Sequence, residues 1–176
     1  MMSNNISSLP SGDIIKIITS DDVTLQVEKP IALFSKSISN LLDDLGSINE
    51  PVPLPNVSSE VYQLIHSFSV LFLKNPSSLE TSTSIRTREQ DKFEEMPQWQ
   101  TKYLNELGTE MVLQLILASN YLDIKPILDS CCKYIAKMIN GKTVVEIREL
   151  FNIKNDFTPE EEEQIARENA WLSDAQ

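Results

Sequence analysis

The sequence predicts an α/β fold of the α+β kind, with a small sheet near the N-terminus followed by helices. A mostly β-branched run covers Ile14 to Thr19, and Val23, Leu25 and Val27 then alternate with polar residues, which is typical of a β-hairpin. Further along the chain, apolar residues recur at intervals of three and four, the period of a helix with one buried face. The helical pattern covers far more of the chain than the strand pattern.

Composition limits the function classes. The 176 residues suit one domain, or one compact domain with an extension, and 41% hydrophobic with 23% charged residues is ordinary globular composition. A net charge of −11 disfavours binding to nucleic acid or to anionic membranes, and no apolar run approaches the length of a membrane span. The only two cysteines, Cys131 and Cys132, are neighbours, so we expect no disulfide framework and an intracellular protein of the cytoplasm and nucleus.

After the hairpin, the first half of the sequence predicts two helices and one more strand. A helix containing Ile38 to Leu45 should end at Gly46, and Val52 and Leu54 lie among prolines, which permits only a short edge strand. A second helix should begin after a Ser58 cap and fade near Asn75 and Pro76. Its predicted apolar face consists of Val61, Leu64, Ile65, Phe68 and Phe72.

A segment rich in Ser, Thr and charge, at about 74–95, predicts a mobile linker, and Trp99 predicts that the chain packs again on the core after it. The stretch from Thr109 to Ser119 is apolar on nearly every side, which predicts a central, buried helix. A further helix should follow until Gly141, with Cys131 in the core.

Two capping boxes predict the last two helix starts: Thr143 with Glu146, and Thr158 with Glu161. Pro159 then falls at the first helical position, where its missing N–H costs nothing. The final helix is mostly glutamate and has few apolar residues to hold it to a core. These residues either contact a partner or pack within the chain, and the pattern favours neither alternative. The apolar residues in and beside the helix are Phe157, Ile165, Trp171 and Leu172.

Catalytic motifs are missing from the sequence. His66 is the single histidine and lies off the apolar stripe of its helix, so a solvated position is expected. No phosphate-binding glycine loop, metal-ligand motif or nucleophile elbow is present, and consecutive glutamates on a helix do not converge on one cation. We expect no metal and no cofactor. An enzyme remains a remote alternative, for instance a hydrolase whose site assembles from residues distant in sequence.

Several blocks of sequence carry a family resemblance. They are residues 115–125 (LILASNYLDIK), 141–143 (GKT), 152–158 (NIKNDFT), 167–169 (REN) with Trp171, and in the first half 43–46 (DDLG) and 52–57 (VPLPNV), with Pro97 and Trp99 between. Together they resemble the S-phase-kinase-associated adaptor family of SCF (Skp/cullin/F-box) ubiquitin ligases, and the resemblance covers nearly the whole chain.

The resemblance implies a flexible N-terminus at 1–13, a BTB/POZ domain at 14–140, and C-terminal helices at 141–176 that bind F-box proteins. It implies a non-enzymatic adaptor that bridges F-box substrate receptors to a cullin. The F-box-binding residues it implies are Ile153, Asn155, Phe157, Ile165, Asn169 and Trp171. The cullin-binding residues it implies are Asn120 and Tyr121, with Pro53, Leu54, Pro55 and Asn56 as a weaker suggestion.

An alternative remains within the same resemblance. Members of this family dimerise when no F-box is bound, so the chain could instead be a structural scaffold that self-associates or assembles outside a ligase. Pro159 resembles a proline that is hydroxylated in some lineages, although its role at the helix start accounts for it without modification. Departures such as Pro126, where glycine is common, suggest a paralogue with a narrowed choice of partners.

Overall fold

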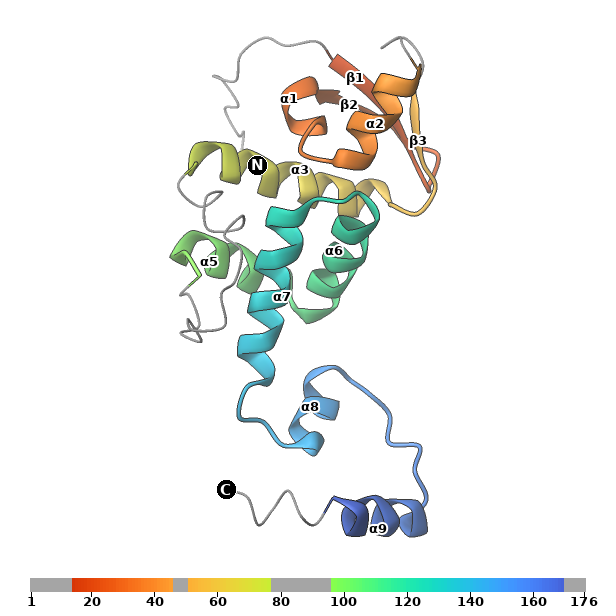
Figure 1. Ribbon diagram of the computed structural model, residues 1–176, viewed down its shortest axis with the longest axis vertical. Coiled ribbons are helices and arrows are strands. Elements are labelled where there is room, and N and C mark those ends of the chain that lie inside the picture. Colours follow the sequence, from red (N-terminus) through yellow and green to blue (C-terminus); the bar gives the residue numbers. More distant parts are fainter. Residues whose placement is uncertain (1–13, 46–50, 77–95, 170–176) are drawn as a thin grey trace, which may run out of the picture. The chain divides into compact units, whose positions relative to one another are not determined.

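The computed structural model describes residues 14–45, 51–76 and 96–169, shown as coloured ribbons in Figure 1. The chain divides into two compact units, one up to Met138 and one from Ile139 onward. Four expectations lie outside the described residues: the flexible 1–13 segment, the helix end at Gly46, residues 77–95 of the 74–95 linker, and the positions of Trp171 and Leu172. None of the described helices is long and apolar enough to span a membrane.

The first unit begins with the expected hairpin. Strand β1 (Ile14–Thr19) pairs antiparallel with β2 (Thr24–Glu28), and β3 (Val52–Leu54) adds in parallel on the other side of β1. The order β2-β1-β3 confirms Val52 to Leu54 as a short edge strand. Pro53 fits there because an edge position does not need every N–H.

The hairpin turn is fastened to the helix after β3 by one carboxylate. Thr19 Oγ1 and Ser59 Oγ each donate to Asp21 at 2.5 Å, and the Ser59 N–H donates to the same carboxylate at 3.0 Å. These hydrogen bonds, from the Ser59 side chain first and then from Thr19, lower the pKa of Asp21 from 3.8 to about 2. Asp21 thereby joins two segments 38 residues apart in the chain.

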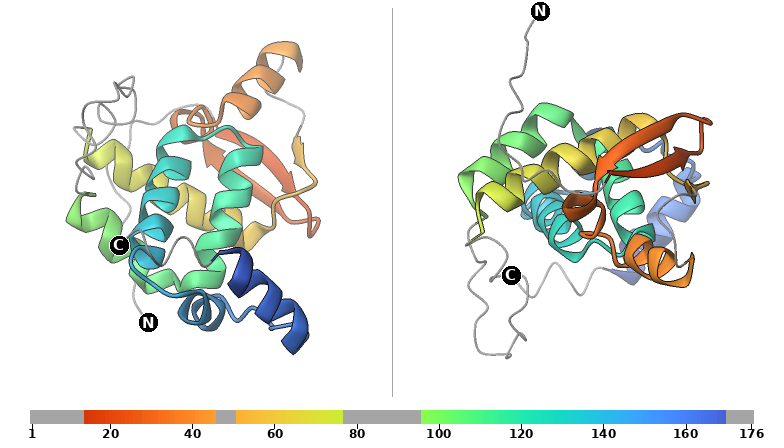
Figure 2. Two further views of the ribbon diagram at one scale, coloured as in Figure 1. Left: turned by 60° about the horizontal axis from the view of Figure 1, so that its bottom comes forward. Right: turned by 90° about the horizontal axis from the view of Figure 1, so that it is seen from above.

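Helices make up most of the described residues of the first unit. The helix α1 (Lys29–Ala32) packs on β1 and β2, and α2 (Lys36–Leu45) lies next to β3. The helix α6 (Thr109–Tyr121) packs on both α3 (Ser59–Lys74) and α5 (Gln98–Leu107), an arrangement that can be followed in Figure 2. The helix α7 (Lys125–Ile139) follows, and the first unit ends at Met138, one residue before the end of this helix. The Ser58 side chain accepts a hydrogen bond from the Val61 N–H, which confirms the predicted cap of α3.

An aromatic cluster joins α3 to α5. The Phe68 ring lies 4.7 Å from the Tyr103 ring, 5.1 Å from Phe72 and 5.7 Å from Trp99, measured between centroids. Trp99 also meets the edge of Phe72 at 5.1 Å. These contacts confirm that Trp99 packs on the core after the long segment that precedes it.

Two expectations about individual side chains were wrong. The helix α6 buries Val112 and Leu115, yet Leu117 is 71% exposed, so this helix is central on one face only. His66 is half-buried and its Nε2 lies 3.0 Å from the Glu28 carboxylate, because the helix position beside its apolar stripe faces β2. The hydrogen bond from His66 lowers the pKa of Glu28.

Cys131 is buried as expected, and burial raises the pKa of its thiol to about 12.

The second unit contains α8 (Val144–Leu150) and α9 (Pro159–Glu168). Both predicted capping boxes are present, and Pro159 is the first residue of α9. Within α9, the exposed side chains of Glu163 and Arg167 form an ion pair, with 3.6 Å between the carboxylate and the guanidinium. Neither helix buries a single residue, which sets this unit apart from the first.

Candidate functional site

The start of α8 is fixed by its own side chains. The Thr143 N–H and Oγ1 donate to the Glu146 carboxylate at 2.7 and 2.8 Å, and the Glu146 N–H returns a bond to Thr143 Oγ1 at 3.3 Å. These bonds from Thr143 lower the pKa of Glu146. The helix start therefore forms without burying any residue.

The end of α8 closes in a Schellman motif. The Ile153 N–H donates to the Arg148 carbonyl at 2.8 Å, and the Asn152 N–H donates to the Glu149 carbonyl at 3.2 Å. Asn152 has a φ of +52°, in the left-handed region that asparagine adopts more readily than most residues. The motif reverses the chain and leaves the Ile153 side chain exposed.

The start of α9 repeats the arrangement of α8. The Thr158 N–H donates to the Glu161 carboxylate at 2.8 Å, and the Glu161 N–H donates to Thr158 Oγ1 at 3.3 Å. Pro159 follows with a fixed φ and no N–H to satisfy. Helix formation here depends on local capping, because no residue of α9 is buried.

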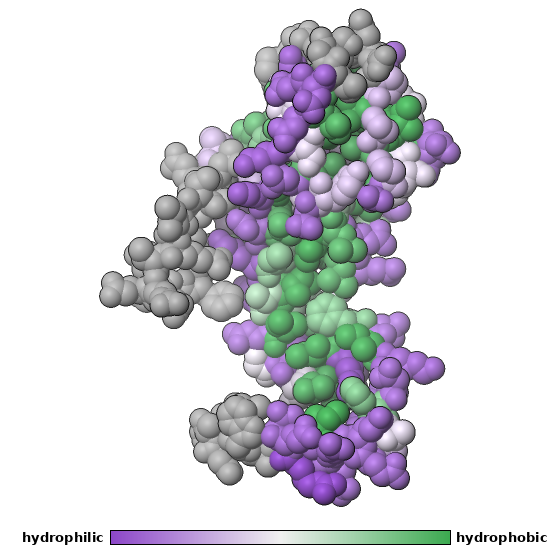
Figure 3. Space-filling model, turned by 45° about the vertical axis from the view of Figure 1, so that its right-hand side comes forward, coloured by the Kyte–Doolittle hydropathy of each residue, from purple (hydrophilic) through white to green (hydrophobic). Residues whose placement is uncertain are grey.

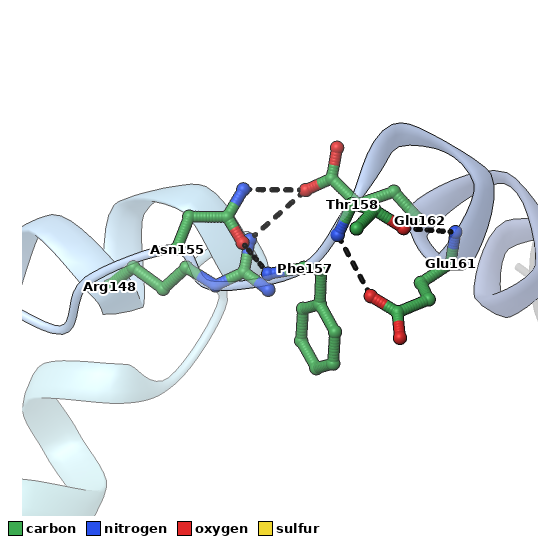
Figure 4. Close-up of polar contacts among 6 residues, drawn as sticks. All are labelled: Arg148, Asn155, Phe157, Thr158, Glu161 and Glu162. Atoms are coloured by element: carbon green, nitrogen blue, oxygen red, sulfur yellow. Dashed lines mark hydrogen bonds and ion pairs between the residues drawn. The ribbon is translucent and has the colours of Figure 1, made fainter.

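Arg148 and Glu162 connect the two helices (Figure 4). The Arg148 guanidinium lies 3.6 Å from Glu162 Oε1 and 5.5 Å from the centre of the Phe157 ring. Asn155 Nδ2 donates to the same Glu162 oxygen at 2.7 Å, and the Phe157 N–H donates to Asn155 Oδ1 at 3.5 Å. In the loop between the helices, Asn155 and Phe157 are thus held by contacts with both α8 and α9.

An open pocket of about 360 Å³ lies beside these contacts. It mixes apolar side chains with charged and amide groups, and its lining residues are Val145, Arg148, Glu149, Asn152, Ile153, Asn155 and Glu162. Such a lining offers apolar contact and hydrogen-bonding groups together, a combination that suits a side chain from a protein partner.

The candidate F-box-binding residues described by the structure all lie on the surface of the second unit. Ile153 is 53% exposed, Phe157 46% and Ile165 41%. Asn155 is hydrogen-bonded to Glu162, while Asn169 Nδ2 donates to the Ile165 carbonyl at 2.9 Å near the end of α9. Trp171 lies outside the described residues.

The candidate cullin-binding residues Asn120 and Tyr121 are exposed at the C-terminal end of α6. The chain around them is held by α2 and the residue before it, since Ser35 Oγ donates to the Leu122 carbonyl at 2.6 Å and Ser37 Oγ to the Tyr121 carbonyl at 3.1 Å. The backbone at this helix end is therefore well fixed.

Sequence reasoning missed the exposed apolar residues that precede Tyr121 on α6. Leu113, Leu117 and Tyr121 are all exposed and are spaced four residues apart, so they share one face of the helix. Figure 3 shows hydrophobic side chains gathered on the surface of the first unit, whereas the surface of α9 in the same view is mostly hydrophilic. The four-residue spacing could have indicated that these residues share a face. However, a helix that is apolar on nearly every side contains several such rows, and the spacing does not show which row is exposed.

The weaker candidates around β3 differ in accessibility. Pro53, Pro55 and Asn56 are exposed, but the Leu54 side chain is 1% exposed and packs in the core. A partner at this edge would meet the neighbours of Leu54, while Leu54 itself holds the strand in place.

Among the described residues, no group of three or more His, Cys, Asp or Glu side chains is arranged to hold a metal ion. The glutamates of α9 instead serve the helix cap, the contact with Arg148 and the pair with Arg167.

The comparisons with known proteins give one consistent result. Residues 13–67 match the model of the Skp1 family tetramerisation domain, and residues 125–172 match that of the Skp1 family dimerisation domain. The chain is 46% identical to the suppressor of kinetochore protein 1 of Schizosaccharomyces pombe, over 91% of this chain and 98% of that protein.

Two further relatives carry ligase names. The chain is 40% identical to the SCF ubiquitin ligase complex protein SKP1a of Dictyostelium discoideum, over 92% of this chain and 96% of that protein. It is 44% identical to the E3 ubiquitin ligase complex SCF subunit sconC of Talaromyces marneffei, over 91% of this chain and 97% of that protein. With matches at this identity over nearly its whole length, the chain belongs to the Skp1 family.

Proposed function

We propose that this chain is the adaptor subunit of an SCF-type ubiquitin ligase and bridges F-box substrate receptors to a cullin. Membership of the Skp1 family and the SCF names of two relatives support this role. The observation that carries it is the second unit, whose two capped helices bury no residue and expose apolar side chains.

The proposed role requires no reaction on this chain. An adaptor that holds a substrate receptor and a cullin in one complex raises their effective concentration, so transfer of ubiquitin to the substrate becomes effectively intramolecular. Positioning is the whole contribution of the adaptor in this proposal, and the catalytic groups belong to other subunits.

The proposed F-box surface lies on the second unit. Its apolar members are Ile153, Phe157 and Ile165, which surround a loop fixed by the Schellman motif and the Thr158 cap. Asn155 and Asn169 supply amide groups at the two ends of α9. Trp171 completes the proposed set from the chain after α9.

The proposed cullin surface lies on the first unit, at Asn120 and Tyr121. Both side chains are exposed and the backbone beneath them is hydrogen-bonded to Ser35 and Ser37. The exposed residues Pro53, Pro55 and Asn56 are proposed as secondary contacts. A rigid helix end presenting a tyrosine is a common composition for a binding site.

Calorimetric titration with a purified F-box domain tests the F-box surface. We expect a one-to-one complex, weakened by about 2 kcal/mol or more in Trp171→Ala and in Phe157→Ala, the scale of an interface hot spot. Folding should persist in both variants, since Phe157 is exposed and its loss leaves no cavity.

A matched pair of isoleucines controls this titration. Ile165→Ala, on α9, should weaken the complex, whereas Ile14→Ala should leave its affinity unchanged, because Ile14 is an exposed isoleucine of the first unit. Equal losses from both substitutions would contradict the proposed location of the F-box surface.

A further inference from the structure

The attachment of α9 to α8 depends on few contacts. Neither helix buries a residue, so α9 lacks the hydrophobic packing that stabilises most helices in proteins. A helix of 10 residues with only local capping is marginally stable in water. Its orientation relative to α8 must then depend on the side chains that span the loop between them.

Arg148 is the residue that spans this loop. It lies in the last turn of α8, its side chain is only 23% exposed, and its guanidinium lies 3.6 Å from Glu162 in the first turn of α9. The same guanidinium lies over the Phe157 ring at 5.5 Å, within the range of a cation–π contact. Arg148 therefore contacts both the apolar residue of the loop and the helix that follows it.

Glu162 is the second half of this connection. One of its carboxylate oxygens receives the Asn155 amide at 2.7 Å and faces Arg148. Asn155 in turn accepts the Phe157 N–H. The carboxylate thereby ties α9 to α8 and, through Asn155, to the loop, whereas the neighbouring Glu163 pairs with Arg167 inside α9.

We propose that Arg148 and Glu162 form a bridge that orients α9 against α8 and so preorganises the surface formed by Ile153, Phe157 and Ile165. Arg148 is thus a positioning residue for partner binding. This inference rests on the proposed function for its consequence, because it names the partner surface as the F-box surface. The bridge itself is a property of the free chain.

The expected size of the effect follows from population arithmetic. A partner that binds only the oriented arrangement has its apparent affinity reduced in proportion to the fraction of molecules in that arrangement. A single partly exposed ion pair changes such a fraction by roughly fivefold at most. Arg148→Met also removes the contact with Phe157, so its effect should exceed that of Glu162→Gln, which removes the ion pair and weakens the acceptor of Asn155.

Residual dipolar couplings test the bridge without any partner. In the wild-type protein, couplings of backbone amides in α8 and α9 should fit one alignment tensor, as two parts of one rigid body do. In Arg148→Met and Glu162→Gln they should require two tensors, while in Glu163→Gln one tensor should suffice. One tensor in all four proteins would overturn the bridge, and so would two tensors in the wild type.

Titration of the same variants with an F-box domain tests the consequence. Glu162→Gln should weaken binding measurably, by up to about fivefold, while its neighbour Glu163→Gln, with the same change of charge, should match the wild type. Arg148→Met should weaken binding further. In the double variant the loss should be smaller than the product of the two single losses, since both substitutions break one bridge.

Three outcomes of this titration would overturn the inference. Equal losses from Glu162→Gln and Glu163→Gln would mean that the net charge of the protein determines the affinity. A loss in the double variant equal to the product of the two single losses would mean that Arg148 and Glu162 each contact the partner independently. Unchanged affinity in Arg148→Met would remove its positioning role. A wild-type protein that binds no F-box domain would instead refute the proposed function and the named surface, with the couplings still deciding the bridge.

Discussion

Leu115 and Leu117 lie two residues apart on α6 and have opposite environments. Leu115 is fully buried between α6 and its neighbours, whereas Leu117 is 71% exposed on the face shared with Leu113 and Tyr121. The periodicity of an almost continuously apolar segment could not separate these roles, because several faces of the helix look equally buried. Only the packing of α6 on α3 and α5 decides which face is covered.

This contrast predicts a large difference in stability. Leu115→Ala should lower the free energy of unfolding by about 2–5 kcal/mol, because it removes buried methyl groups and leaves a cavity. Leu117→Ala should change it by less than about 0.5 kcal/mol, because its side chain is already in water. Urea unfolding of both variants measures the difference, and similar losses would show that the exposed face of α6 is covered in solution.

Asp21 gives a second prediction for a single residue. Its pKa is about 2 in the folded chain and 3.8 ordinarily, so its ionised form stabilises the fold above pH 4 and this contribution is lost as the pH falls toward 2. The stability difference between wild type and Asp21→Asn should therefore be largest near neutral pH and shrink below pH 4.

Denaturant midpoints at several pH values between 7 and 2 measure this difference. Asp22→Asn is the matched control, since the Asp22 side chain does not take part in the contacts with Thr19 and Ser59. A difference for Asp21→Asn that stays constant down to pH 2 would show that the carboxylate charge is not what fastens the turn to α3.

At the scale of elements, the local signals of the sequence were the most informative. Both capping boxes, the Ser58 cap and the β1–β2 hairpin were predicted because each depends on residues a few positions apart. Contacts between distant residues could not be predicted in this way. The His66 pair with Glu28 and the Arg148 contact with Glu162 depend on how elements pack, which no local pattern specifies.

The capping of α9 yields a prediction for that element. Thr158→Ala removes the oxygen that accepts the Glu161 N–H and should destabilise α9 by about 1 kcal/mol, whereas Thr158→Ser should retain the cap. Because α9 has no buried residue, this loss should appear as faster hydrogen exchange in α9 while the core helices α3 and α6 are unaffected. Faster exchange throughout the chain would contradict the independence of this helix.

At the scale of the whole molecule, each compact unit carries the proposed surface for one partner. The candidate residues of the second unit could be chosen from the sequence only through a family resemblance, since sparse apolar residues on a polar helix left packing and binding equally open. The exposure of Ile153, Phe157 and Ile165 in the structure favours binding. A substitution in one of the two surfaces should then weaken the binding of one partner and leave the affinity for the other partner unchanged.

Asn120→Lys tests this separation. A lysine at the exposed end of α6 should abolish or strongly weaken cullin binding by adding an unpaired charge and bulk, while F-box affinity stays at the wild-type value. Gln114→Lys, which adds the same charge at another exposed position of α6, is the control and should retain both partners. Surface plasmon resonance with each partner separately measures the two affinities.

The most direct test of the bridging role is size-exclusion chromatography of an F-box domain and a cullin, with and without this chain. The account predicts that the F-box domain elutes with the cullin only when the chain is present, in a one-to-one-to-one complex. An F-box domain that elutes apart from the cullin even with the chain present would contradict the adaptor role.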